Sequence, residues 1–186
     1  DLIGQSAVFT RVRNAARMVA PTDATILLTG ETGAGKATLA REIHACSTRR
    51  LRPFLGLSCS ALAPDLFDLA PLTESGATLR AAAGGTLFLD EVADLEPGAQ
   101  AARLRYLETG AVGPMGREPL SLRVVAATAT DLAERVREGA FRRDLFHRLN
   151  VVPLEVPPLR ERVEDLPLLL RHYARAFARD HGRPAF

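Results

Sequence analysis

The residues from Gly30 to Lys36 have the types and spacing of a loop that binds phosphate groups. They read Gly-Glu-Thr-Gly-Ala-Gly-Lys and follow the apolar run at 26–29. Glycines let successive backbone N–H groups converge on phosphate oxygens, a lysine reaches the terminal phosphates, and the helix that follows presents its positive end. We therefore expect nucleotide binding here. The residues expected to contact the nucleotide are Gly30, Glu31, Thr32, Gly33, Ala34, Gly35, Lys36, Ala37 and Thr38.

The position after the lysine departs from this pattern. A Ser or Thr usually stands there, and its hydroxyl binds Mg²⁺. This chain has Ala37, with Thr38 one residue later. The sequence therefore supports nucleotide binding better than hydrolysis.

A second motif delivers two carboxylates at the end of an apolar strand. Gly84-Gly-Thr-Leu-Phe-Leu precedes Asp90 and Glu91. Asp90 can hold Mg²⁺ directly or through water, and Glu91 can orient and deprotonate a water that attacks the terminal phosphate. A charged pair that merely ends a strand is the commoner case in isolation, but the upstream phosphate loop favours the catalytic interpretation.

Several arginines gather between Phe141 and Leu149. Arg142 and Arg148 are candidates to reach a nucleotide on a neighbouring subunit, where they would neutralise charge in the transition state. The alternative is a solvated basic face, which the spacing alone favours.

The order of elements predicts an α/β fold with a mainly parallel sheet between helices. Short apolar runs predict strands at 25–29, 54–57, 86–89, 123–127 and 151–156. Helices are expected at 36–46, 97–108, 131–138 and 141–149, with Pro97 in a first turn and Asp131 as an N-cap. Residues 77–85 are expected to form a loop or a helix end. Prolines mark a boundary, so residues 1–156 are expected to form the nucleotide-binding core and residues 157–186 the start of a helical subdomain. Apolar residues recur at helical spacing in this second part, and we interpret them as one helix of an incomplete core.

Composition and missing motifs narrow the classes of protein to which this chain could belong. The 186 residues are 47% hydrophobic and carry a formal charge of +2, so we expect a globular domain without a general affinity for DNA or membranes. Cys46 and Cys59 are too few for a disulfide scaffold or a zinc site, and we expect a cytoplasmic protein. A GTPase is disfavoured because no Asn-Lys-x-Asp string occurs. A metal hydrolase is disfavoured because His44, His147, His172 and His181 lack paired ligand spacing.

Long strings of the chain resemble the AAA+ domain of bacterial enhancer-binding proteins, the NtrC-type activators of sigma-54 RNA polymerase. The similar strings are Ile3-Gly-Gln-Ser6, residues 20–25, Gly30 to Lys36, Gly84 to Glu91, Phe141 to Val152, and Pro157-Pro-Leu-Arg-Glu-Arg162. The resemblance implies a P-loop NTPase core that binds ATP with Mg²⁺ at Asp90, and it adds Ile3 and Gly4 to the nucleotide site. It places Arg142 and Arg148 at the family's arginine-finger positions, which reverses the interpretation from spacing.

The same resemblance implies partners. It implies a ring oligomer, commonly a hexamer, or a dimer at rest. DNA would be bound only by a separate helix-turn-helix domain, and RNA polymerase would be the target of the assembled protein.

Three residues differ from the family pattern. Ala37 replaces an acidic residue that supports the metal. Ser58 replaces an asparagine that couples Glu91 to the nucleotide, and its hydroxyl reaches less far. Ala129 replaces the sensor asparagine near the terminal phosphate, so that polar contact is expected to be lost.

A fourth departure is a deletion. Between Phe67 and Gly84 the family carries a long loop tipped with GAFTGA, which engages the sigma factor, and this chain has no such string. The loop at 110–122 is also expected to be shorter. We therefore expect no remodelling of sigma-54 polymerase, and action with the housekeeping polymerase or as a repressor.

These features support one leading function and two alternatives. The leading hypothesis is an ATP-binding regulatory module of a transcription factor, in which nucleotide controls oligomerisation and hydrolysis is weak or absent. The first alternative is an active ATPase, with Thr38 or water completing the metal shell. The second is an interaction domain with no nucleotide function.

Overall fold

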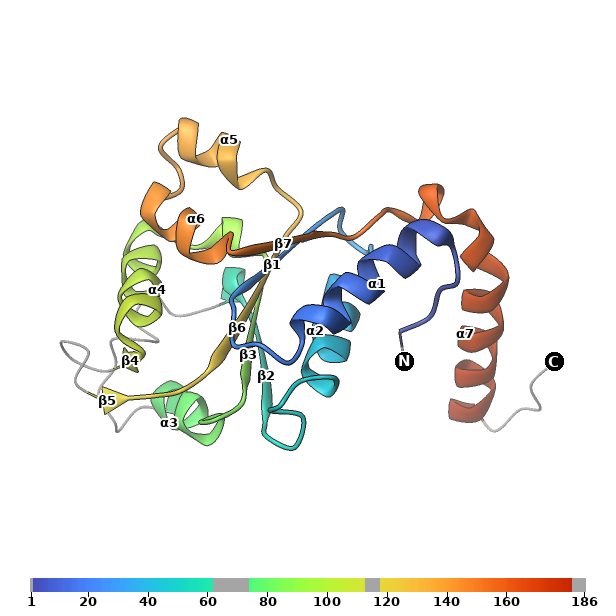
Figure 1. Ribbon diagram of the computed structural model, residues 1–186, viewed down its shortest axis with the longest axis horizontal. Helices are drawn as coiled ribbons and strands as arrows, with labels where there is room; N and C mark the ends of the chain where they lie inside the picture. The colour runs from blue at the N-terminus through green and yellow to red at the C-terminus, as the bar shows by residue number, and fades with distance from the viewer. Residues whose placement is uncertain (1, 62–73, 113–117, 182–186) are drawn as a thin grey trace.

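The centre of the fold is a five-stranded parallel sheet (Figure 1). The computed structural model describes residues 2–61, 74–112 and 118–181. The strand order is β2-β3-β6-β1-β7. These strands are β1 (Ile26–Thr29), β2 (Phe54–Ser58), β3 (Thr86–Asp90), β6 (Arg123–Thr128) and β7 (Val152–Glu155). A separate antiparallel pair joins β4 (Ala111–Val112) to β5 (Glu118–Pro119).

Helices cover both faces of this sheet. They are α1 (Ala7–Val19), α2 (Lys36–Ala45), α3 (Glu74–Ala81), α4 (Pro97–Thr109), α5 (Leu132–Arg137) and α6 (Arg143–Leu149). A further helix, α7 (Leu166–Asp180), does not cover the sheet. Short 3₁₀ turns follow β2, β3 and β7, namely η1 (Cys59–Ala61), η2 (Val92–Asp94), η4 (Leu159–Glu161) and η5 (Val163–Asp165).

The central strands are buried on both faces, which explains their continuous apolar sequence. Successive side chains of a strand point to opposite sides. In β3, Leu87 and Leu89 join the core under α4 and α6, whereas Phe88 joins the core under α1 and α2. The apolar residues of β6 alternate between the two cores in the same way. The sheet therefore lies between two helical layers, and the predicted α/β fold is confirmed.

The predicted elements match the structure closely. All five predicted strands are present, with ends that differ by at most one residue. The four predicted helices are present too; α4 begins at Pro97, and Asp131 caps α5 by accepting hydrogen bonds from the N–H groups of Ala133 and Glu134. Two helices were missed. One is α1. The other is α3, of which only the second half falls within 77–85, the stretch expected to be a loop or a helix end.

The edge strand β7 contains a proline without losing a sheet hydrogen bond. Val152 and Val156 donate their N–H groups to Thr25 and Thr29 beside β1. In the strand alternation Pro153 faces the open side, where no ladder partner is needed. Pro153 thus removes one donor from the exposed edge and hinders pairing with another strand.

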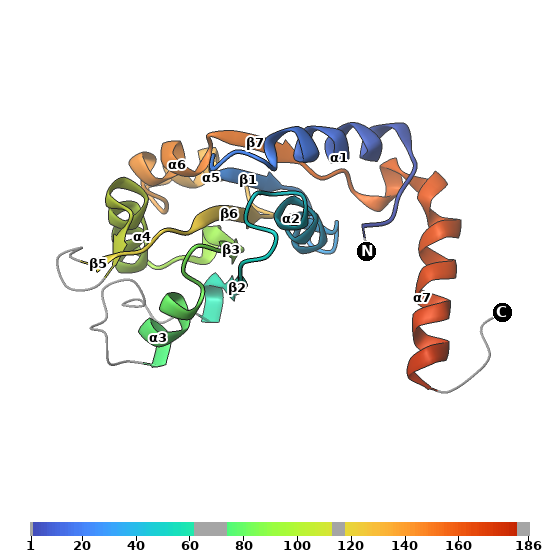
Figure 2. The same ribbon diagram turned by 60° about the horizontal axis from the view of Figure 1, so that its bottom comes forward.

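Helix α7 extends away from the sheet at one end of the molecule (Figure 2). Its apolar residues recur at helical spacing, as predicted, but Leu170, Tyr173 and Phe177 are each about two-thirds exposed. The assignment of 157–186 to a separate subdomain stays a prediction. Among the described helices, none is both long and apolar enough to cross a bilayer.

The imidazole of His44 is buried between α2 and β3. Its Nδ1 lies 2.8 Å from the Thr86 hydroxyl, and the ring packs edge-on against Phe54. Burial lowers the pKa of His44, and the charge of Arg123 acts in the same direction, while a hydrogen bond with the backbone of Arg52 opposes both. The folded protein therefore favours the neutral form of His44.

This histidine should make stability fall in mild acid. Below the ordinary histidine pKa of about 6.5 the unfolded chain binds a proton that the folded protein does not, so unfolding becomes easier as pH falls. We expect the free energy of unfolding in urea to drop between pH 7 and pH 5.5 with a slope of up to about one proton. His44→Gln should lose that slope, and His147→Gln, on the exposed side of α6, should keep it. Equal slopes in all three proteins would contradict this assignment.

Candidate functional site

The loop between β1 and α2 is shaped by glycines with positive φ. Gly30, Gly33 and Gly35 have φ values of 141°, 81° and 100°. A side chain at Gly30 would also lie 2.5 Å from the Val156 carbonyl oxygen. Gly35 caps α2 without a side-chain hydrogen bond, so the first N–H groups of this helix have no side-chain acceptor from the cap. Glycines thus set the backbone of this loop, and its contact with a phosphate stays a prediction.

Lys36 lies at the start of α2 and its side chain is only 5% exposed. Its Nζ donates to the carbonyl oxygens of Gly30 at 2.8 Å and Glu31 at 3.2 Å. The same atom lies 3.1 Å from Oε1 of Glu91. The structure therefore brings the predicted phosphate-binding lysine together with the predicted catalytic carboxylate.

Asp90 and Glu91 stand where β3 ends. Burial raises the pKa of Asp90, the neighbouring charge of Glu91 raises it further, and Lys36 opposes both. Glu91 has φ of 53°, and it is the one non-glycine residue with positive φ in the described part of the chain. Its Oε2 accepts a hydrogen bond from the backbone N–H of Ala129 at 2.8 Å.

Ser58 and Ala129, which stand where the family carries asparagines, make different contacts in the structure. The Ser58 hydroxyl pairs with the Ser60 hydroxyl at 2.9 Å, and no contact joins it to Glu91 within the described residues. Ala129 has no side-chain polar group, but its backbone N–H touches Glu91. This contact could not be predicted from residue types, because every residue except proline carries a backbone N–H.

A cavity of about 190 Å³ opens beside the phosphate loop. It is lined by Leu2, Ile3, Phe9, Gly33, Ala34, Gly35, Thr38, Leu159, Arg162, Leu169 and Tyr173. The structure thus places Ile3 and Thr38 at this cavity. Gly4 lies outside the lining, and a side chain there would clash with the Phe9 ring. Glu31 and Thr32 line an adjoining hollow with Pro158 and Arg160, and Ala37 is exposed.

Two arginines after β7 hold the phosphate loop. Arg160 pairs with Glu31 at 2.7 Å on the surface. Arg162 is buried, donates to the Ala34 carbonyl at 2.6 Å and lies over the Phe9 ring at 4.5 Å. Burial lowers the pKa of Arg162, and the nearby Asp165 opposes that effect. Neither arginine was predicted from the sequence to belong to the site.

Asp165 fastens the N-terminal segment next to the same cavity. Its carboxylate accepts from the N–H groups of Gln5 at 2.6 Å and Ser6 at 2.8 Å, and from the Ser6 hydroxyl at 2.9 Å. Burial alone would raise the pKa of Asp165, but these hydrogen bonds outweigh it and the pKa is lowered. This carboxylate therefore joins the start of α7 to the segment that carries Ile3.

Replacing this carboxylate should loosen the cavity wall. Asp165→Asn keeps one acceptor but weakens charge-assisted bonds to a buried site, so we expect a loss of about 1–2 kcal/mol in the free energy of unfolding. Glu164→Gln, one residue earlier and exposed, should change it by less than about 0.5 kcal/mol. Urea unfolding of the three proteins measures both values, and equal stability of all three would show that the bonds to Asp165 contribute little.

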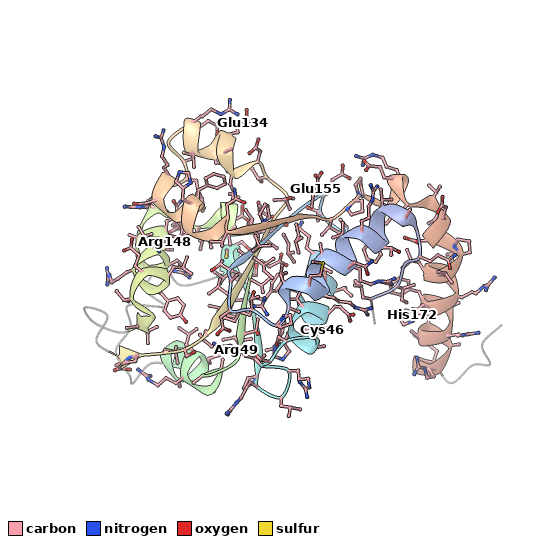
Figure 3. The ribbon with its side chains drawn as sticks, viewed as in Figure 1. Cys46, Arg49, Glu134, Arg148, Glu155 and His172 are labelled. Carbon is pink, nitrogen blue, oxygen red and sulfur yellow. The ribbon has the colours of Figure 1, made fainter. Side chains whose placement is uncertain are left out.

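The predicted finger arginines lie apart from this cavity. Arg142 forms a two-pronged pair with Asp144, at 3.0 and 2.7 Å, and this bond raises the pKa of Arg142 and lowers that of Asp144. Arg148 lies on α6 (Figure 3). Its Nη2 is 3.8 Å from Oε1 of Glu108 on α4. In the described structure no contact joins either arginine to Lys36. Both are about half exposed, as a group reaching another subunit must be.

The residues present fit a magnesium ion that is held mainly by phosphates and water. Asp90 forms no hydrogen bond or ion pair with another side chain in the described residues, so its carboxylate is available as a ligand. No cluster of three or more His, Cys, Asp or Glu side chains in the described residues could hold a metal alone. Mg²⁺ commonly binds through one or two carboxylates together with substrate phosphates.

The cysteines play no part in this site. Cys46 is exposed and Cys59 is buried, and both are free thiols. Burial raises the pKa of Cys59 to about 12, so it stays protonated and unreactive.

Comparison with known proteins identifies the family. The sequence profile of the Sigma-54 interaction domain matches residues 2–155. The transcriptional regulatory protein ZraR of Salmonella typhimurium is 44% identical over 191 aligned residues, covering 95% of this chain and 43% of that protein. The C4-dicarboxylate transport regulator DctD of Rhizobium meliloti is 41% identical, covering 98% of this chain and 43% of that protein. This chain therefore spans less than half the length of these relatives.

Solved structures agree with the fold. NtrX from Brucella abortus, in complex with ATP, has a TM-score of 0.88 at 37% identity, covering 98% of this chain and 44% of the NtrX chain. The P-loop NTPase domain of a sigma-54 transport activator from E. coli has a TM-score of 0.60 at 24% identity, covering 84% of this chain and 99% of that domain, and shares the fold. The chain belongs to the Sigma-54 interaction domain family, the AAA+ P-loop NTPase domain of NtrC-type transcriptional regulators.

Proposed function

We propose that this domain binds ATP and uses the bound nucleotide to control self-association within a transcription regulator, with slow hydrolysis or none. The observation that carries the proposal is the glycine loop, which leads to the buried Lys36 and lines a cavity of about 190 Å³. NtrX, a relative of similar structure, has been crystallised with both ATP and ADP.

Nucleotide binding alone can drive assembly. A ligand bound only by the assembled form stabilises that form by RT ln(1 + [L]/Kd), about 2.7 kcal/mol when ATP exceeds Kd a hundredfold. The exposed Arg142 and Arg148 are the groups we assign to a nucleotide on the neighbouring subunit, in a dimer at rest or a ring such as a hexamer. No chemical step is needed for this effect.

Slow hydrolysis is supported by three side chains that are too short or too apolar to contact the metal, Glu91 or the terminal phosphate. Ala37 carries no oxygen next to the lysine, Ser58 bonds to Ser60 instead of Glu91, and Ala129 has only a methyl group. Asp90 is the residue that would hold Mg²⁺, which would neutralise phosphate charge. Glu91 would orient a water molecule at the terminal phosphate.

We also propose that the domain does not remodel sigma-54 polymerase. The sequence lacks the GAFTGA string. The two loops predicted to be short, at 68–83 and 110–122, lie partly outside the described residues, which omit 62–73 and 113–117. The intact regulator would then act with another form of RNA polymerase or as a repressor, with DNA bound by a separate domain.

An active ATPase is the second candidate. It is favoured by the retained pair Asp90 and Glu91 and by the contact of Glu91 with Lys36. In that case turnover per molecule should rise with protein concentration, because a shared site needs two subunits.

The deciding experiment measures ATP binding and phosphate release on the purified protein, with and without Mg²⁺. Lys36→Ala and Glu91→Gln are the matched variants. Binding with little phosphate release supports the proposal. Turnover that grows with protein concentration and disappears in Glu91→Gln supports the ATPase, whereas no binding at millimolar ATP overturns both.

A further inference from the structure

The ammonium of Lys36 has no proton left for a ligand. A lysine offers three N–H donors. Two of them are used by the carbonyl oxygens of Gly30 and Glu31, at 2.8 and 3.2 Å, and the third faces Oε1 of Glu91 at 3.1 Å. A phosphate oxygen that binds Lys36 must therefore displace one of these three partners.

Glu91 is the partner that can leave most easily. The two carbonyl groups belong to the backbone of the phosphate loop, whose conformation is set by glycines, so moving them would reshape the loop. The Glu91 carboxylate is 30% exposed and leaves by a side-chain rotation. The terminal phosphate and Glu91 thus compete for one proton of Lys36.

A second contact keeps the Glu91 side chain in the site when a phosphate binds Lys36. Its other oxygen, Oε2, is bound by the Ala129 N–H at 2.8 Å. The φ of 53° at Glu91 holds the residue in a conformation that non-glycine residues seldom adopt, so this placement is imposed by the surrounding structure. The strand β2 supplies no comparable contact, since Ser58 is bonded to Ser60.

We infer that Lys36 and the backbone N–H of Ala129 are the positioning groups of the Glu91 carboxylate, and that a nucleotide phosphate releases Glu91 by taking Lys36. The inference rests on the proposed nucleotide binding and adds a regulatory step to it. Without nucleotide, Glu91 is held by both groups. With a terminal phosphate bound, Glu91 keeps the bond from Ala129 to Oε2, and its other oxygen, Oε1, is released from Lys36.

The competition between Glu91 and the terminal phosphate for Lys36 should reduce nucleotide affinity, and substitutions at Glu91 should raise it. Glu91→Gln removes the charge that Lys36 must give up, and Glu91→Asp keeps the charge but shortens the reach. We expect both variants to bind the non-hydrolysable analogue AMP-PNP about 3- to 10-fold more tightly than the unaltered protein. Glu42→Gln removes a carboxylate on the same helix that pairs with Arg17 instead of Lys36, and should change the affinity less than twofold.

A direct readout is available because Lys36 is the only lysine among the 186 residues. Protein labelled with ¹³C-lysine gives a single side-chain CεH₂ signal in NMR. We expect this signal to differ between the free unaltered protein and free Glu91→Gln, and to coincide once both are saturated with AMP-PNP, because Lys36 then binds phosphate in each.

The outcomes separate this inference from the proposed function. Identical signals in the two free proteins, or no gain in affinity in either Glu91 variant, would overturn the inference while nucleotide binding stands. No response of the Lys36 signal to millimolar AMP-PNP in any variant would overturn the proposed function, and the inference with it.

Discussion

Replacing Lys36 with alanine should weaken ATP binding at least a hundredfold. The ammonium is the buried positive charge of the phosphate loop, and its bonds to the Gly30 and Glu31 carbonyls also hold the loop in shape. The variant loses both effects and leaves Glu91 without its cationic partner. A hundredfold loss corresponds to about 2.7 kcal/mol, in the range expected for removing a charge-assisted phosphate contact. Titration calorimetry with ATP, or fluorescence of a labelled nucleotide, measures the change.

The matched control is Arg41→Ala on the same helix. Arg41 lies over the ring of Phe54 at 4.8 Å, and among the described residues it forms no hydrogen bond or ion pair with the phosphate loop. Its removal lowers the net charge by the same amount, and we expect ATP affinity to stay within about twofold because exposed charges are screened by salt. If Lys36→Ala, shown to be folded by circular dichroism, bound ATP as well as the Arg41→Ala control, the loop would not be the nucleotide site.

The sequence predicted the sheet well because its strands are central and parallel. Such strands are buried on both faces, so they appear as short apolar runs between turn residues, and β1, β3 and β6 all have this form. The phosphate loop and the Asp90–Glu91 pair could also be predicted, because each needs particular residue types at fixed spacing. In contrast, α1 was missed although it is strongly amphipathic and begins at a good N-cap, Ser6.

The contacts that the sequence could not reveal are long-range or made by the backbone. Asp165 reaches Ser6 across 159 residues, and Arg162 reaches Ala34 across 128. No local pattern encodes such a pairing, which depends on how β7 returns along β1. The support of Glu91 by Ala129 is hidden for another reason, since the donor is a backbone N–H that every non-proline residue carries. An alanine at this position therefore removes a side-chain contact without leaving Glu91 unsupported.

The other large effect is expected at Gly85, which stands directly before β3. A Cβ atom there would approach the Pro53 carbonyl oxygen more closely than real Cβ atoms do, and would lie 2.8 Å from the Ala82 carbonyl oxygen. Both oxygens belong to the backbone and both are hydrogen-bonded, Pro53 to the N–H of Thr86 and Ala82 to the N–H of Gly85 itself. Neither can move without breaking the start of the strand. We therefore expect Gly85→Ala to lower the free energy of unfolding by about 3 kcal/mol or more.

Gly98→Ala in α4 is the matched control for this glycine. Nothing lies within 4 Å of a Cβ atom at that position, and alanine is favoured over glycine in helices by about 0.5–1 kcal/mol, so the control should be unchanged or slightly more stable. Urea unfolding at pH 7.5 compares the two variants. Because β3 ends at Asp90 and Glu91 follows directly, Gly85→Ala should also weaken any ATP turnover more than the control does. A Gly85→Ala protein as stable as Gly98→Ala would mean that this turn adapts, and that the glycine is not required by the close approach to Pro53.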